Sequence, residues 1–339
     1  MRPIAIFAAG VLIAGPVSGH HSDTAMDMES VATFEGTITE FYLRNPHTYF
    51  SVETMNERGE QIEWTVQMAS AIVASRRGWR RDTLSVGDWV TVSSHPSRDG
   101  RPYGVFVSIQ NADGVALPIS AETEPEVVAS TSTLEGKWIA DSSKLISYTG
   151  GPDDFAMFSR ALTEKAEIAQ AAYDENSSEN PELSCIGQPT PAMIIVSDLY
   201  PLEIELNEAE ETIAIRSQYF DSERIVYMDG RAHPESGERF LEGHSIGRWE
   251  SGTLVVDTTN FADHRSPYQG GIPSGAQKHV IERYELAEGG TRMVLEFMLE
   301  DPEYILGSVT HRRELTYSPQ IDMTSFNCDM ESTQRFVPR

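Results

Sequence analysis

The C-terminal two thirds of the chain consists of short alternating apolar segments separated by glycine-bearing turns. Asp229-Gly230, Ser251-Gly252 and Gly289-Gly290 are typical hairpin turns, and the segments between such turns alternate as half-buried β-strands do. We expect strands at residues 134–140, 193–196, 202–206, 212–217, 225–228, 245–250, 253–258, 280–286, 293–299, 309–317 and 324–328. A long meander tends to close on itself because closure removes exposed sheet edges. The pattern therefore predicts a large antiparallel β-barrel over residues 133–339, with one helix at 158–173.

A second unit is predicted before this barrel. Residues 32–43, 48–54 and 61–66 have strand patterns, residues 70–78 have helical composition, and residues 88–94 and 103–110 return to strand. Three strands, a helix and two strands in this order predict a small barrel of the OB type over residues 20–118. Residues 119–132 are acidic and polar, which is typical of a linker. The fold class is therefore mainly β.

The N-terminus has the features of an export signal. Arg2 precedes an apolar run at residues 4–15, and Val17 and Gly19 are small residues before a cleavage point. We expect a signal peptide at residues 1–19, a mature chain that starts at His20, and a periplasmic or secreted protein that is not embedded in a membrane. In an oxidising compartment Cys185 and Cys328 should form one disulfide.

Charge excludes one class of partner. The chain has 26 basic and 52 acidic residues and a formal net charge of −26, and phosphate backbones are bound mainly by Lys and Arg. We therefore expect no nucleic-acid partner. The sequence does not determine the oligomeric state.

Several separated motifs resemble a known family. These are His20-His21-Ser22, Gly36, Asn45-Pro46-His47, Arg77-Gly78-Trp79 and Val86-Gly87-Asp88. Over residues 20–116 they resemble the DUF6152 family of exported bacterial proteins, and residues 229–234 and 243–257 resemble the C-terminal part often fused to it. The resemblance implies no activity, because the family is uncharacterised. Gly136 and Trp138 resemble the entrance of calycin barrels, which makes a calycin-like second barrel the expectation.

The N-terminal histidines suggest a metal site. An N-terminal His20 can chelate through its amino group and its imidazole, and His21 and His47 could complete a nitrogen-rich set that favours copper, with zinc behind it. The alternative is that His20 and His21 belong to an unstructured terminus and that His47 only caps a turn.

A second set of polar residues lies in the barrel strands. His244 or His279 could carry a proton, Asp257 or Glu282 could orient that histidine, and Arg248 could contact an anion. His233, His264 and His311 lie in the same region. The alternative is structural, with these groups forming a solvated face or a barrel-closing ion pair. Without phosphate-binding or dinucleotide-binding glycine motifs or a His-Glu-x-x-His pair, no organic cofactor is expected.

Three functions remain open from the sequence. The first is binding of a small, largely apolar organic molecule in the second barrel, because residues 293–299 could line a pocket with Met and Phe side chains. A cofactor-independent lyase, isomerase or hydrolase step could follow that binding. The second is copper binding or handling. The third is a non-catalytic adaptor among envelope proteins, which should expose an apolar patch.

Overall fold

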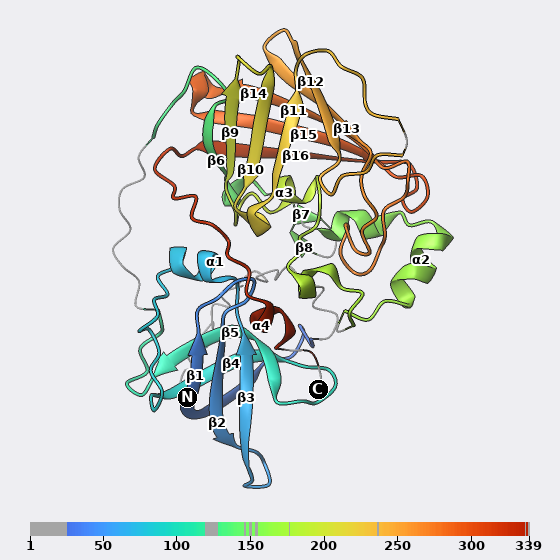
Figure 1. The fold of residues 1–339 in the computed structure, drawn as a ribbon. Coiled ribbons are helices and arrows are strands. Elements are labelled where there is room, and N and C mark those ends of the chain that lie inside the picture. Colours follow the sequence, from blue (N-terminus) through green and yellow to red (C-terminus); the bar gives the residue numbers. More distant parts are fainter. Residues whose placement is uncertain are drawn as a thin grey trace, which may run out of the picture.

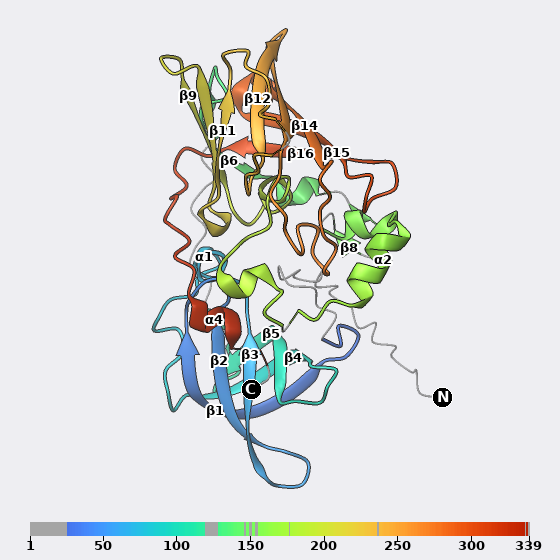
Figure 2. The ribbon, with the colours of Figure 1, turned by 45° about the vertical axis from the view of Figure 1, so that its right-hand side comes forward.

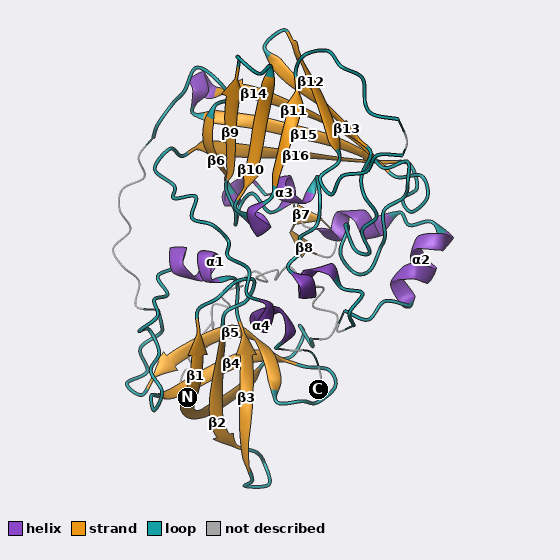
Figure 3. Ribbon diagram, in the orientation of Figure 1, coloured by secondary structure: helices purple, strands orange, loops and turns teal. Residues whose placement is uncertain are grey.

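The computed structural model describes residues 26–118, 128–145, 147–148, 151–152, 155–175, 177–235, 237–335 and 337. These residues form two β-barrels, with the smaller N-terminal one at the bottom of Figure 1 and the larger one at the top. Short helices and the C-terminal segment lie between the two barrels (Figure 3). The predicted signal peptide, His20, His21 and most of the predicted linker fall outside the described residues.

The small barrel has five strands and one helix. Their bounds are β1 Ala32–Tyr42, β2 Tyr49–Met55, β3 Gln61–Gln67, α1 Ala71–Arg76, β4 Trp89–Pro96 and β5 Tyr103–Asn111. The sheet closes in the order β1-β2-β3-β5-β4. An odd number of strands cannot alternate direction around a closed barrel, and the one parallel pair is β3 with β5. This arrangement confirms the predicted OB-like barrel.

The large barrel has nine strands. Their bounds are β6 Gly136–Ala140, β9 Leu202–Asn207, β10 Thr212–Ser217, β11 Glu223–Tyr227, β12 His244–Glu250, β13 Thr253–Thr259, β14 His279–Ala287, β15 Arg292–Glu300 and β16 Ser308–Tyr317. Neighbours in sequence are neighbours in the barrel, and β16 pairs with β6 to close it. The odd strand number again requires a parallel pair, here β11 with β12, which pair through only two residue positions. A long crossover, residues 228–243, connects those two strands.

Alternation along the strands fills the large barrel with side chains. Trp138, Ile204, Tyr284, Leu295 and Leu315 are fully buried in one core cluster. Because Trp138 also carries a polar N–H, its Nε1 needs an acceptor, and it donates to the carbonyl oxygen of Leu134 at 2.9 Å. The barrel interior is therefore a packed core.

The remaining helices are short. They are α2 Glu164–Ala171, α3 Ala192–Ile195 and α4 Met330–Gln334, and two-residue strands β7 Ser147–Tyr148 and β8 Gly151–Pro152 form a separate ribbon. The turned view in Figure 2 shows α2 beside the large barrel and α4 against the small one. None of the helices in the described part of the chain has the length and apolar character to cross a membrane.

Two predicted strands and the expected single helix of the second domain were wrong. Residues 193–196 lie in and just after the buried helix α3, because a four-residue apolar run fits either a strand or a helix and its surroundings decide. Residues 324–328 form no strand, because the closed barrel offers them no free edge. The described residues of the second domain thus contain three short α-helices, and α2 covers only the middle of the predicted helix at 158–173.

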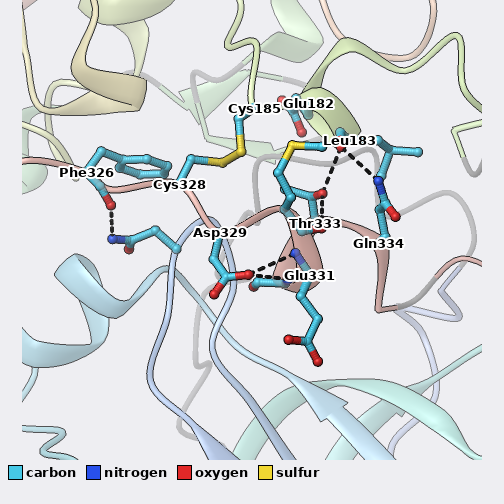
Figure 4. Close-up of a disulfide and its surroundings, with 12 residues drawn as sticks. Glu182, Leu183, Cys185, Phe326, Cys328, Asp329, Glu331, Thr333 and Gln334 are labelled. Carbon is cyan, nitrogen blue, oxygen red and sulfur yellow. Dashed lines mark hydrogen bonds between the residues drawn. A yellow bond between two sulfur atoms is a disulfide. The ribbon is translucent and has the colours of Figure 1, made fainter.

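The C-terminal segment, residues 318–337, leaves the large barrel and runs to the small one. Cys328 forms the predicted disulfide with Cys185, and their sequence separation is 143 residues. Beyond the disulfide, the Thr333 hydroxyl donates to the carbonyl oxygen of Leu183 at 2.9 Å, and Asn45 of the small barrel donates to the carbonyl oxygen of Phe326 (Figure 4). The segment is thereby fixed to both barrels.

Candidate functional site

Three histidines and one aspartate form a hydrogen-bonded group on the outer face of the large barrel, which we call the histidine cluster (His233, His244, Asp257 and His279). Thr258 and Val280 are paired positions that point into the barrel, so the adjacent Asp257 and His279 point outward. The Nε2 atom of His279 lies 2.8 Å from Oδ1 of Asp257. Strand alternation therefore makes this pair.

His233 joins the crossover to this pair. It lies in residues 228–243, and its Nε2 is 3.2 Å from Oδ1 of Asp257. Its other ring nitrogen, Nδ1, is 2.9 Å from Nδ1 of His244 at the start of β12. A chain of contacts thus runs from the carboxylate through His233 to His244.

The hydrogen bonds assign the protons. The Asp257 carboxylate only accepts, so His233 must donate from Nε2, and a neutral His233 then has a bare Nδ1. His244 must donate its Nδ1–H to that atom, which leaves Nε2 of His244 with a lone pair. No described residue hydrogen-bonds to this Nε2. His244 is therefore set up as a proton acceptor.

The surroundings of His244 and His279 shift their pKa values in opposite directions. Burial, followed by the neighbouring His233 and Arg231, lowers the pKa of His244 below its ordinary value. The hydrogen bond to Asp257 raises the pKa of His279, and the same bond lowers the pKa of Asp257. Two titratable groups whose pKa values are pushed apart are a recurring feature of acid–base sites. His244 is thus neutral and His279 more readily charged near neutral pH.

A groove of about 570 Å³ runs beside His244, and we call it the β11 groove (residues 185–188, 219–225, 227 and 240–244). One wall includes Cys185, so the disulfide borders the groove. Ile186, Phe240 and Leu241 also line it, and each is at least 40% exposed. Exposed apolar side chains gathered around one hollow are typical of sites that bind apolar molecules.

Aromatic packing fixes the His244 ring at the groove wall. Tyr227 of β11 stacks on it with ring centroids 5.1 Å apart and planes 21° apart. The Arg231 guanidinium lies 3.9 Å from the Tyr227 ring centroid, on a turn stabilised by its ion pair with Asp229. These contacts hold the imidazole in one orientation.

Two predicted site residues lie away from the cluster. Arg248 is exposed and pairs with Glu250, as the structural alternative proposed. Glu282 points into the barrel, where both of its oxygens accept from Arg224 at 2.7 and 2.6 Å. Of the two carboxylates considered from the sequence, Asp257 is the one that contacts histidines.

Residues 243–247 read Gly-His-Ser-Ile-Gly, the spacing of a serine nucleophile elbow, a match that the sequence reasoning overlooked. An elbow requires a sharp turn from strand to helix, with the serine exposed. Ser245 instead lies within β12, is 1% exposed, and contacts Thr258 at 2.9 Å inside the barrel. This motif match therefore carries no nucleophile.

Of the three predicted metal ligands, the structure describes only His47. His20 and His21 fall outside the described residues. His47 is 2% exposed, and its Nδ1 lies 3.3 Å from the Met68 carbonyl oxygen and 3.2 Å from Nε2 of Gln67. Within the described ranges no group of three His, Cys, Asp or Glu residues is placed to hold a metal ion. The copper site stays a prediction that rests on the N-terminus.

The other two histidines considered from the sequence, His264 and His311, are buried away from the histidine cluster. Burial lowers the pKa of His264 to about 4, and its Nδ1 accepts from the Ser266 backbone N–H. His311 lies inside the barrel beside Phe297, with ring centroids 5.5 Å apart. Neither histidine lines the β11 groove.

Apart from His244 and Cys185, sequence reasoning singled out none of the groove residues, and Tyr227 and Glu242 are among those that it missed. Tyr227 was outside the set because an aromatic residue in a strand is usually core. Glu242 sits in a crossover with no periodic pattern. Its position two residues before His244 was the available signal.

Comparison with known proteins adds one assignment. The family model described as "Family of unknown function (DUF6152)" matches residues 9–106, which span most of the small barrel. The match confirms the resemblance predicted from the N-terminal motifs. No curated protein matches the chain. Neither comparison assigns an activity to the large barrel.

Proposed function

We propose that the protein binds a small, largely apolar organic molecule in the β11 groove and acts on it by acid–base chemistry, with His244 as proton acceptor. The observation that carries this proposal is that His244, whose Nε2 has no hydrogen-bond partner among the described residues, lines a groove with exposed Ile186, Phe240 and Leu241. The sequence suggested the barrel interior as the pocket. Since side chains fill the described interior, we locate the site in the groove instead.

The reaction class follows from the groups present. A neutral imidazole that donates from Nδ1 can take a proton at Nε2, and the positive charge then develops on the His244 ring. His233, held by its own hydrogen bond to Asp257, accepts from Nδ1 of that ring and so stabilises the charge. This chemistry serves lyase, isomerase or hydrolase steps, and none of them requires an organic cofactor. A location outside the cytoplasm accords with the disulfide, which persists in oxidising compartments.

The test separates binding from turnover. Nile red, a neutral apolar dye, reports binding, and conversion is followed by mass spectrometry of a small-molecule extract of producing cells incubated with the protein. Ile225→Trp should fill the groove and abolish dye binding, since Ile225 lines it. His244→Gln should retain dye binding but lose any conversion that the wild type performs. His95→Gln, a histidine of the small barrel, should behave as wild type.

Two outcomes would contradict the proposal. Dye binding that survives Ile225→Trp would place the apolar site elsewhere. Conversion that survives His244→Gln would remove the proton acceptor, and the protein would then be a binding protein only. An adaptor role would gain support if the dye site were instead competed by another envelope protein.

A further inference from the structure

The β11 groove contains a carboxylate with no cation on it. Glu242 lines the groove, and its Oε2 accepts from the backbone N–H and the hydroxyl of Thr190 at 2.8 and 2.9 Å. Its Oε1 accepts no hydrogen bond from the described residues and retains some solvent-accessible surface. No described Lys, Arg or His forms an ion pair with Glu242.

The neighbouring cations are directed elsewhere. Arg224 is held by Glu282, with Nη2 at 2.6 and 2.7 Å from its two oxygens. Lys278 is 1% exposed, with its ammonium nitrogen 4.0 Å from the centroid of the Phe261 ring. Burial raises the pKa of Glu242, and the hydrogen bonds from Thr190 and the more distant charges of Arg224 and Lys278 offset only part of that effect. The group is therefore incompletely compensated.

Other residues that line the groove are also acidic or apolar. Asp221 and Glu223 also line it, and Glu223 is already paired with Arg216. Its exposed apolar wall consists of Ile186, Phe240 and Leu241, next to the aromatic Tyr227. Acidic groups beside aromatic and aliphatic surface suit a cation with an apolar body, and they disfavour an anion.

We propose that the molecule bound in the β11 groove is an organic amine, whose ammonium pairs with Oε1 of Glu242 while its apolar part lies against Ile186, Phe240 and Leu241. This inference rests on the proposed function and gives its substrate class. Glu242 would set specificity, while His244, two residues further along the chain, would accept the proton. The carboxylate selects charge and the apolar wall selects size.

Three probes of equal length but different charge test this assignment. Hexylammonium, hexanol and hexanoate are titrated into the full-length protein, and binding is followed by saturation-transfer NMR. The wild type should bind hexylammonium at least about tenfold more tightly than hexanol, and hexanoate least. Glu242→Gln, which keeps the Thr190 contacts available, should remove that tenfold preference and leave hexanol unchanged. Glu285→Gln on the outer face of β14 is the matched control and should change nothing.

The outcomes distinguish this inference from the proposed function. If hexanol and hexylammonium bind equally and Glu242→Gln has no effect, the amine assignment is overturned while apolar binding in the groove stands. Tightest binding of hexanoate would overturn it as well. If none of the probes binds, or if Ile225→Trp leaves binding intact, both proposals fail. Circular dichroism of each variant verifies that the fold is retained.

Discussion

Replacing one buried lysine should make the protein more stable at neutral pH. Lys278 is 1% exposed, and its Nζ makes no hydrogen bond within the described residues. It lies over the rings of Phe261 and Tyr268, at 4.0 and 5.3 Å from their centroids. Burial lowers its pKa from 10.5 to about 7. The folded protein therefore disfavours the charged amine that the unfolded chain prefers.

The magnitude follows from linkage. A pKa difference of about 3.5 corresponds to about 5 kcal/mol at 25 °C. Between pH 7 and 10.5 the unfolded state binds the extra proton, so stability should rise with pH by about 1.4 kcal/mol per unit from this group. Lys278→Met removes that dependence. The Met side chain fills similar space without an amine to desolvate, so we expect a net gain of about 2–4 kcal/mol at pH 7.

Urea unfolding at pH 7.0 and 9.5, followed by tryptophan fluorescence, measures the effect. The advantage of Lys278→Met over wild type should be largest at pH 7.0 and shrink to less than about 1 kcal/mol at pH 9.5. Lys144→Met, at an exposed lysine, is the control and should lie within about 0.5 kcal/mol of wild type at both values. A Lys278→Met variant that is less stable at pH 7.0, or that keeps the wild-type pH dependence, would refute the reasoning.

Two further predictions concern the histidine cluster and the disulfide. In Asp257→Asn the pKa of His279 should fall towards its ordinary value in an NMR titration, and an unchanged titration would contradict the assigned contact. In the wild type, the stability that the Asp257–His279 pair adds is present below about pH 6, while Asp257 is ionised. It should fade as pH rises through the pKa of His279. The double variant Cys185→Ser/Cys328→Ser should lose up to roughly 4–5 kcal/mol of unfolding free energy. Backbone amide hydrogen exchange should also speed up in α4. Unchanged exchange would show that the C-terminal segment is held without the disulfide.

Sequence patterns were sufficient for most of the fold because each barrel strand alternates. The period of two in residues 280–286 determines which side chains of β14 point inward, and glycine-bearing turns mark the ends of the strands. The pattern could not determine the type of residues 193–196, since a short apolar run fits a helix as well as a strand. Nor could it show the parallel pairing of β11 and β12. An odd number of strands requires a parallel pair only when the sheet closes into a barrel.

The candidate site was only partly accessible from the sequence. Asp257 and His279 lie on adjacent antiparallel strands, so alternation could bring them together. The contact of His233 with His244 depends on the path of the 228–243 crossover, which has no period. The same crossover carries Glu242 into the groove. Alternation could have separated Glu282 from Asp257, because Glu282 lies between Val280 and Tyr284 in the period of two and therefore shares their inward face.

The measurement that tests the central claim most directly is the protonation state of His244. Long-range ¹H–¹⁵N correlation spectra at pH 7, with the resonances assigned by His244→Gln, distinguish the two ring nitrogens. We predict a neutral ring that carries its proton on Nδ1 and has a bare Nε2, with a pKa below the ordinary value for histidine. A ring protonated on Nε2, or an imidazolium at pH 7, would contradict the assignment of His244 as the proton acceptor of the groove.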